Sequence, residues 1–208
     1  MIALTSVIGT GCGAERSGPR SDSHAAAAAV AFDLARTRPL GSGPAFRPSP
    51  TANRLVSAGA SVGSMRCEPG VGRPYGAHIE LFARERQVAV PAGIGIAPPR
   101  QVHESVVSGR CVYPLRTTDP TGVVKVDRGR LGGTPRLGEL FRIWGQPLSV
   151  RTLAGFAATG PEGVVAFLDG ERWSGDPAAI PLGRHAQIVL ELDAAVAPHT
   201  AYTFPPGL

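Results

Sequence analysis

The sequence is poor in charged, aromatic, cysteine and histidine residues. Of its 208 residues, 18% are charged and 6% aromatic; Lys125 is the sole lysine, and there are three cysteines and five histidines. No apolar run approaches the ~20 residues of a membrane-spanning helix. The low charge, with 27 glycines and 20 prolines, excludes a coiled coil, and glycine lacks the three-residue period of collagen. These values are typical of one folded domain with an attached flexible segment.

The net charge of +5 is unevenly distributed along the chain. Residues 13–62 hold six arginines against three acidic residues, whereas residues 63–208 hold 15 basic and 13 acidic residues. A nucleic-acid-binding domain concentrates positive charge on its fold, so we expect no nucleic-acid partner. A basic tail is attracted instead to an anionic envelope surface.

Residues 1–12 are predicted to be an export segment. Residues 1–11 are uncharged and mostly apolar or small, which suits the apolar part of a signal peptide. The stretch from Gly9 to Gly13 resembles a bacterial lipobox, in which a cysteine, here Cys12, is lipidated. It departs from the usual pattern because Gly9 replaces leucine and no positive charge precedes the run. A cleaved secretory signal and the absence of any targeting signal are the alternatives.

Residues 13–62 are predicted to form a flexible basic tether. Ser23 can cap a short Ala-rich helix over 24–36, which Pro39 would stop. Residues 40–62 have the composition of a linker and show no sustained hydrophobic period.

Residues 63–208 are predicted to be the globular domain, built of short strands and tight turns. Hairpins are expected over 78–90 and over 111–127. A third is expected where residues 164–168 run into Asp169-Gly170, which suits a two-residue turn with positive φ. Residues 186–192 alternate as a strand, and 201–208 are expected to form a short edge strand.

One amphipathic helix is predicted to cover the sheet. Thr134 and Pro135 suit its beginning, Gly145 suits its left-handed end, and Pro147 blocks its continuation. Between them an apolar stripe at helical spacing is formed by Leu137, Leu140, Phe141 and Trp144.

An internal similarity relates residues 78–96 to residues 164–182, with five identities at an offset of 86. We interpret it as one hairpin unit used twice. The predicted fold class is therefore α+β and β-rich, with repeated hairpins packed on one helix. A β-grasp-like arrangement is expected, and a β-sandwich is the alternative.

The cysteines are expected to serve export and stability. None forms a C-x-x-C or stands near histidine at metal-ligand spacing. If Cys12 is lipidated, the domain lies outside the cytoplasm, and Cys67 and Cys111 then form one disulfide. The alternative is Cys111 as a thiol nucleophile with His78 or His103 as its base.

No catalytic arrangement, metal site or cofactor is predicted. The sequence contains no G-x-S-x-G, H-E-x-x-H or P-loop, and Gly93-x-Gly95 is followed by Pro98-Pro99 rather than by a phosphate-binding helix. No two of the histidines have a spacing that places them as a metal pair on one element.

An ordered set of motifs resembles a family of bacterial, largely actinobacterial, exported proteins and lipoproteins without an established activity. The motifs are VPAGIGI (90–96), CVYPLRTTDPTGVVKVD (111–127), LGELFRIWGQPLS (137–149), DGERWSGDPAAIPL (169–182) and FPPGL (204–208). The resemblance implies an extracytoplasmic domain.

Relatives in this family carry histidines at H-x-H-x-H in the first hairpin and at L-H-T-H-D in the second. This chain keeps His78 and Asp119 but has Glu80, Arg116 and Thr118 at the other positions, and Lys125 where some relatives have histidine. A ligand or anion site at His78, Arg116, Asp119 and Lys125 is therefore one interpretation.

Together these observations predict a non-enzymatic, membrane-tethered binding or structural module of the bacterial cell envelope. Its expected partners are the membrane, through the lipid anchor, and an envelope protein or polymer. The alternative function is a metal-binding or redox-related exported domain with a degenerate histidine site, and the alternative location is secretion.

Overall fold

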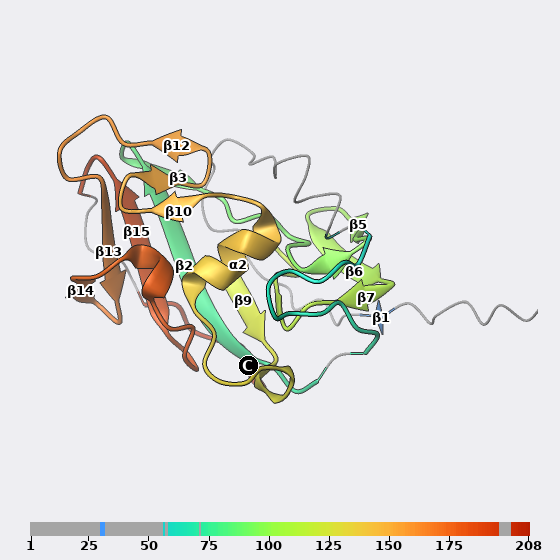
Figure 1. Ribbon diagram of the computed structural model, residues 1–208. Coiled ribbons are helices and arrows are strands. Elements are labelled where there is room, and N and C mark those ends of the chain that lie inside the picture. Colours follow the sequence, from blue (N-terminus) through green and yellow to red (C-terminus); the bar gives the residue numbers. More distant parts are fainter. Residues whose placement is uncertain (1–29, 32–55, 57, 71, 196–200) are drawn as a thin grey trace, which may run out of the picture.

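The computed structural model describes residues 30–31, 56, 58–70, 72–195 and 201–208, and these are dominated by β-strands (Figure 1). A seven-stranded mixed sheet forms the centre of the domain. Its strands are β2 (Tyr75–Ala83), β3 (Arg86–Val88), β8 (Leu115–Arg116), β9 (Val123–Val126), β13 (Val164–Leu168), β14 (Glu171–Trp173) and β15 (Gln187–Leu192). The β-rich α+β class is thus confirmed at this level.

The order across the sheet is β14-β13-β15-β2-β9-β8, with β3 added beside β2. Strands β15 and β2 run parallel at the centre, and all other pairs are antiparallel. Parallel neighbours need a long connection, and here that connection contains β3 to β14, including the helix α2 (Leu137–Trp144).

The two faces of this sheet differ in chemistry. Side chains alternate along a strand, so Ala77, Ile79 and Leu81 of β2 point into the main core, together with Ile188 and Leu190 of β15. Figure 1 shows α2 crossing this side of the sheet. The opposite face carries the alternate residues of β2 and β15, among which His78 pairs in register with Gln187.

Smaller sheets lie around the central one. A three-stranded sheet contains β1 (Val30–Ala31), β6 (Ser105–Gly109) and β5 (Arg100–Val102), and a two-stranded sheet contains β4 (Ile96–Ala97) and β7 (Cys111–Val112). In Figure 1 these strands gather beyond β9. A third sheet is the meander β10 (Leu148–Ser149), β11 (Thr152–Leu153) and β12 (Phe156–Ala157). The described residues also include two short 3-10 turns, η1 (Arg128–Arg130) and η2 (Pro177–Ala179).

The helix α2 carries the predicted apolar stripe but begins later than the sequence suggests. Its buried residues are Leu137, Leu140, Phe141, Ile143 and Trp144. The expectation that Thr134 caps it and Pro135 opens it was wrong. The main chain of Pro135 accepts a hydrogen bond from Leu182 N–H at 2.8 Å, and that of Leu137 donates to Ile180 at 2.8 Å. These bonds hold 135–136 extended, so that Arg136 becomes the N-cap.

The end of α2 agrees with the sequence. Gly145 has φ +73° and ψ +25°, and its N–H and that of Gln146 reach carbonyls of the last turn. This is the left-handed C-terminal cap that glycine favours. We predict that Gly145→Ala lowers the free energy of unfolding by about 1 kcal/mol. Urea unfolding measures this change, with Gly155→Ala, where no atom lies within 4 Å of the new Cβ, as the control. Equal effects of the two substitutions would contradict the prediction.

Two hairpins were predicted correctly. In the first, β2 and β3 are joined by Arg84 and Glu85 with φ of 52° and 65°. In the second, β13 and β14 are joined by Asp169 and Gly170 with φ of 53° and 84°. Positive φ at both central residues matches the right-handed twist of the strands. The strand expected over 186–192 is β15.

The region 111–127 was predicted as one hairpin and is divided between two sheets. Residues 111–112 form β7 and pair with β4, whereas residues 115–116 form β8 and pair with β9. Pro114 separates them, because a proline has no N–H to continue a ladder.

Three further expectations concern the ends of the chain. Residues 201–208 form no strand, which corrects the expected edge strand. Val30–Ala31 form β1 rather than part of the Ala-rich helix expected over 24–36, and the remainder of that helix lies outside the described residues. Cys12, residues 1–12 and most of the predicted tether also lie outside them. No helix in the described part of the chain is long and apolar enough to cross a membrane.

Candidate functional site

A disulfide joins Cys67 to Cys111, as the sequence predicts, with 5.3 Å between the Cα atoms. It lies beside a short antiparallel bridge in which Glu68 and Val112 exchange main-chain hydrogen bonds of 3.0 and 2.9 Å. Arg130 strengthens the same junction, since its Nε lies 3.2 Å from Glu68 Oε2 and its Nη2 donates to Val112 O at 2.9 Å. The disulfide therefore fixes the segment that enters the domain to β7.

His78, one of the sequence-predicted site residues, is buried, with 2% of its surface exposed. Its Nε2 lies 3.1 Å from the carbonyl oxygen of Thr121, which can only accept a hydrogen bond. Nε2 therefore carries a hydrogen. Burial lowers the pKa of His78 to about 4, although hydrogen bonds to Thr121 and Gln187 favour the protonated form. The imidazole is thus neutral at neutral pH.

Asp119 and His78 are linked through Thr121, which both residues contact. The carboxylate of Asp119 accepts hydrogen bonds from Thr118 Oγ1 at 3.0 Å and from Thr121 N–H at 3.2 Å, and it also accepts one from Thr121 Oγ1. Three donors on one buried carboxylate make a closed turn, a role for which aspartate is suited. Asp119 thus shapes the loop that presents the Thr121 carbonyl to His78.

The residues 201–208 form what we call the C-terminal strap, which covers His78. The ring of Tyr202 stacks on the imidazole of His78 with 4.2 Å between centroids and 14° between planes. Gln187 holds the main chain of Tyr202, donating from Nε2 to its carbonyl at 2.9 Å and accepting from its N–H at 3.1 Å. Burial raises the pKa of the Tyr202 hydroxyl, and a hydrogen bond with Thr121 opposes this change.

The strap continues along the same face of the sheet. The ring of Phe204 stacks on His185 at 4.6 Å, and His185 Nε2 lies 2.6 Å from the main-chain oxygen of Leu208. Phe204 passes so close to Gly76 of β2 that a Cβ there would lie 2.7 Å from the ring. We call the surface formed by Gly76, His78, His185 and Gln187 the strap groove.

The other two sequence-predicted residues, Arg116 and Lys125, face each other in the β8–β9 register. Arg116 is 1% exposed, and burial lowers its pKa to about 10 while the charge of Asp127 raises it. Lys125 is partly exposed and pairs in register with Gly76 under the strap. By strand register, Arg116 and Lys125 share the face of His78, but burial leaves Arg116 without access to a dissolved anion.

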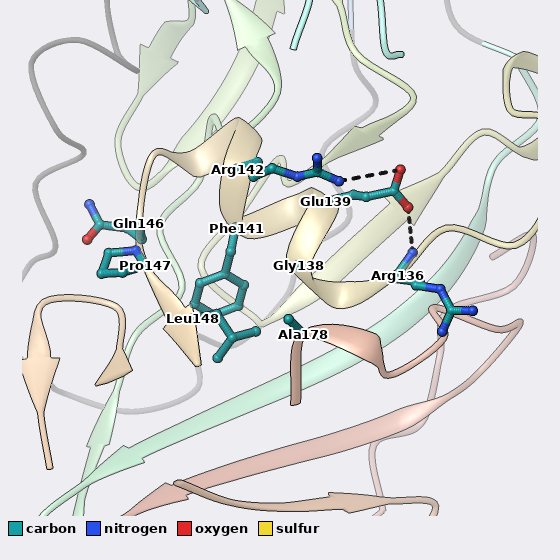
Figure 2. Close-up of a pocket in the computed structure, with 9 residues that line it drawn as sticks. All are labelled: Arg136, Gly138, Glu139, Phe141, Arg142, Gln146, Pro147, Leu148 and Ala178. Carbon is teal, nitrogen blue, oxygen red and sulfur yellow. Dashed lines mark hydrogen bonds and ion pairs between the residues drawn. The ribbon is translucent and has the colours of Figure 1, made fainter. Parts of the chain in front are cut away.

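A separate pocket of about 570 Å³ lies beside α2, on the other side of the sheet (Figure 2). Three of its charged residues, Arg136, Glu139 and Arg142, already have partners. Glu139 accepts a hydrogen bond from the main-chain N–H of Arg136 at 2.7 Å, and its Oε1 lies 4.0 Å from Arg142 Nη2. Arg136 Nη1 donates to the carbonyl oxygen of Ala179 at 2.7 Å. The apolar part of its wall is formed by Phe141, Pro147, Leu148 and Ala178. None of the four residues predicted from sequence lines this pocket.

Two residues that contact Tyr202, Gln187 and Thr121, were not identified as site residues from the sequence. They stand in or near turns and strand ends, where their residue types are ordinary. Tyr202 and Phe204 were assigned to an edge strand, although their spacing of two already places both rings on one side of an extended segment. His103, considered as a base or ligand, lies exposed in the turn between β5 and β6.

Among the described residues, no group of three or more histidine, cysteine, aspartate or glutamate side chains is placed to hold a metal ion. No protein-family model, curated protein or solved structure matches the chain.

Proposed function

We propose that the chain is an extracytoplasmic, membrane-tethered binding or structural module without enzymatic activity. The observation that carries this proposal is the Cys67–Cys111 disulfide, which secures the beginning of the domain. Disulfides persist in oxidising compartments and are rare in the reducing cytoplasm. A domain that incorporates one into its entry segment is suited to the envelope side of the membrane.

The state of the candidate catalytic groups also supports a binding role. Cys111, which the sequence suggested as a thiol nucleophile, has no free thiol because it forms the disulfide with Cys67. His78, the residue considered as its base, donates to a carbonyl oxygen, lies under Tyr202 and has a pKa of about 4. A general base is most effective when its pKa lies near the working pH. These two groups therefore stabilise the fold rather than perform a reaction.

The metal-binding alternative has less support. Its central ligand would be His78, whose Nε2 is directed at the Thr121 carbonyl and whose ring is covered by the strap. Asp119, the other retained member of the family's pattern, already accepts three hydrogen bonds from its own loop.

Replacement of Cys12 tests the proposed membrane attachment. Cys12 ends an apolar segment and follows small residues, so we expect it to carry the lipid anchor. In a bacterial host with lipoprotein processing, Cys12→Ser should move the protein from the membrane fraction to the soluble extracytoplasmic fraction. Immunoblotting of the fractions measures this shift.

Ser6→Ala, a substitution in the same segment, is the matched control and should leave the protein with the membrane. An unchanged distribution of the Cys12→Ser protein would show that the anchor is not at Cys12.

A further inference from the structure

The C-terminal strap is held by side-chain recognition rather than by a β-ladder. Residues 201–208 form no strand, yet Tyr202 and Phe204 each stack on a histidine of the strap groove. The two rings also meet edge to face, with 5.2 Å between centroids. An extended segment with anchoring side chains at every second position is a recurring form of peptide recognition.

The groove is shaped for this segment. Gly76 leaves room for the Phe204 ring. A Cβ at residue 76 would also lie 3.4 Å from the Cβ of Leu208. Gln187 offers both its amide oxygen and its amide nitrogen to one residue of the strap, which fixes the strap's register. His185 holds the main-chain oxygen of Leu208. The ring contacts of Tyr202 and Phe204 depend on the sequence of the strap, whereas Gln187 and His185 bind its main chain.

The described main-chain hydrogen bonds that hold the strap in the groove are few. The described bonds between its main chain and the rest of the domain are those of Gln187 with Tyr202 and of His185 with Leu208. Residues 193–200 join it to the end of β15, so it is covalently connected at one side of the groove. A segment docked in this way can be exchanged between identical chains, because the contacts made within one chain and between two chains are the same.

We propose that the strap groove also accepts residues 201–208 of a second copy of this chain, so that two copies associate by exchanging straps. The occupant is identified by fit, because the sequence Tyr-Thr-Phe-Pro-Pro is the segment whose complementarity the structure displays. The association joins the Tyr202 ring of one copy to His78 of the other, and Phe204 to His185. It is independent of the envelope location proposed above.

Two complementary full-length variants test this exchange, both carrying Cys12→Ser so that no lipid anchor contributes. Gly76→Val blocks the groove, since a Cβ at this position would lie 2.7 Å from the Phe204 ring of the strap. Tyr202→Ala/Phe204→Ala removes both anchors and leaves the groove intact. When the two variants are mixed, the only intact groove and the only intact strap lie on different chains.

The mixture should form a heterodimer by native mass spectrometry and light scattering. In the heterodimer one intact groove holds two aromatic anchors. The association constant of the heterodimer should therefore be about tenfold or more higher than that for self-association of either variant. A mixture that stays monomeric while both variants keep wild-type circular dichroism would overturn the proposal.

A second measurement needs no groove or anchor substitution. Chains with natural and heavy nitrogen isotopes, incubated together at high concentration, should produce mixed dimers, and unlabelled peptide 201–208 should reduce them. A peptide of the same composition in scrambled order should not. Absence of mixed dimers, or dimers that persist unchanged in Gly76→Val alone, would show that the strap groove is not the interface.

Discussion

Removal of the Cys67–Cys111 disulfide is expected to lower the free energy of unfolding by about 3–4 kcal/mol. The bond closes a loop with a sequence separation of 44 residues. In the chain-entropy model, a cross-link of this span restricts the unfolded chain by about that amount. Such a loss is a large fraction of the 5–15 kcal/mol that is typical of a domain. Urea unfolding of Cys67→Ala/Cys111→Ala against the oxidised protein measures it.

The fold should survive this substitution at low denaturant. The main-chain bridge between Glu68 and Val112 and the contacts of Arg130 hold the same junction without the sulfur atoms. Reduction of the wild-type protein should lower its unfolding midpoint as far as the double substitution does, while Cys12→Ser leaves the midpoint unchanged. A loss below 1 kcal/mol would mean that these neighbouring contacts, and not the disulfide, secure the entry segment.

The second large effect is an acid-dependent loss of stability through His78. Its pKa is about 4 in the folded protein and 6.5 in an unfolded chain, because burial disfavours the charged imidazole. Below pH 6.5 the unfolded state takes up a proton that the folded state does not accept. Stability is therefore fully present above pH 6.5, falls as the pH decreases toward 4, and reaches a loss of about 3 kcal/mol.

The contribution of His78 to this pH dependence is measured by urea unfolding of the wild-type and His78→Gln proteins between pH 7.5 and 4. Glutamine can donate to the Thr121 carbonyl but does not titrate, so its stability should decrease less steeply over the same range. The exposed residue His103 provides the control, since His103→Gln should keep the wild-type slope. If wild type and His78→Gln show parallel pH profiles, His78 is not held neutral by the fold.

The features that could be read from the sequence are those set by local chemistry. Asp169-Gly170 specifies its turn because both residues adopt positive φ, and Gly145 ends α2 for the same reason. The apolar stripe of α2 and the alternate apolar residues of β15 both point into the main core. The disulfide could be inferred because the expected lipidation of Cys12 leaves two cysteines to pair.

The features that could not be read depend on partners distant in sequence. The start of α2 is displaced because residues 180–182 hold Pro135 and Arg136 extended, a contact across more than 40 residues. Strands β7 and β8 belong to different sheets, and the sequence of residues 111–116 does not indicate which strands they pair with. The parallel pairing of β2 with β15 is likewise a property of the whole chain.

The candidate site shows the same division. Sequence resemblance selected His78 and Asp119, which the structure brings together around Thr121. It did not indicate that Tyr202 covers the histidine, because residues 201–208 reach β2 only through tertiary packing. Arg116 and Lys125 were considered as an anion-accepting pair, yet Arg116 is buried near Asp127. A pattern of polar residues thus located the region but not its chemistry.

Labelling of cysteines in intact cells tests the proposed location most directly. A maleimide and a reductant that do not cross the cytoplasmic membrane are applied to cells expressing the tagged full chain. We expect no labelling without reduction and two labelled cysteines, Cys67 and Cys111, after reduction. Labelling that requires cell lysis and occurs without reductant would place the chain in the cytoplasm with free thiols and would rule out the proposed location.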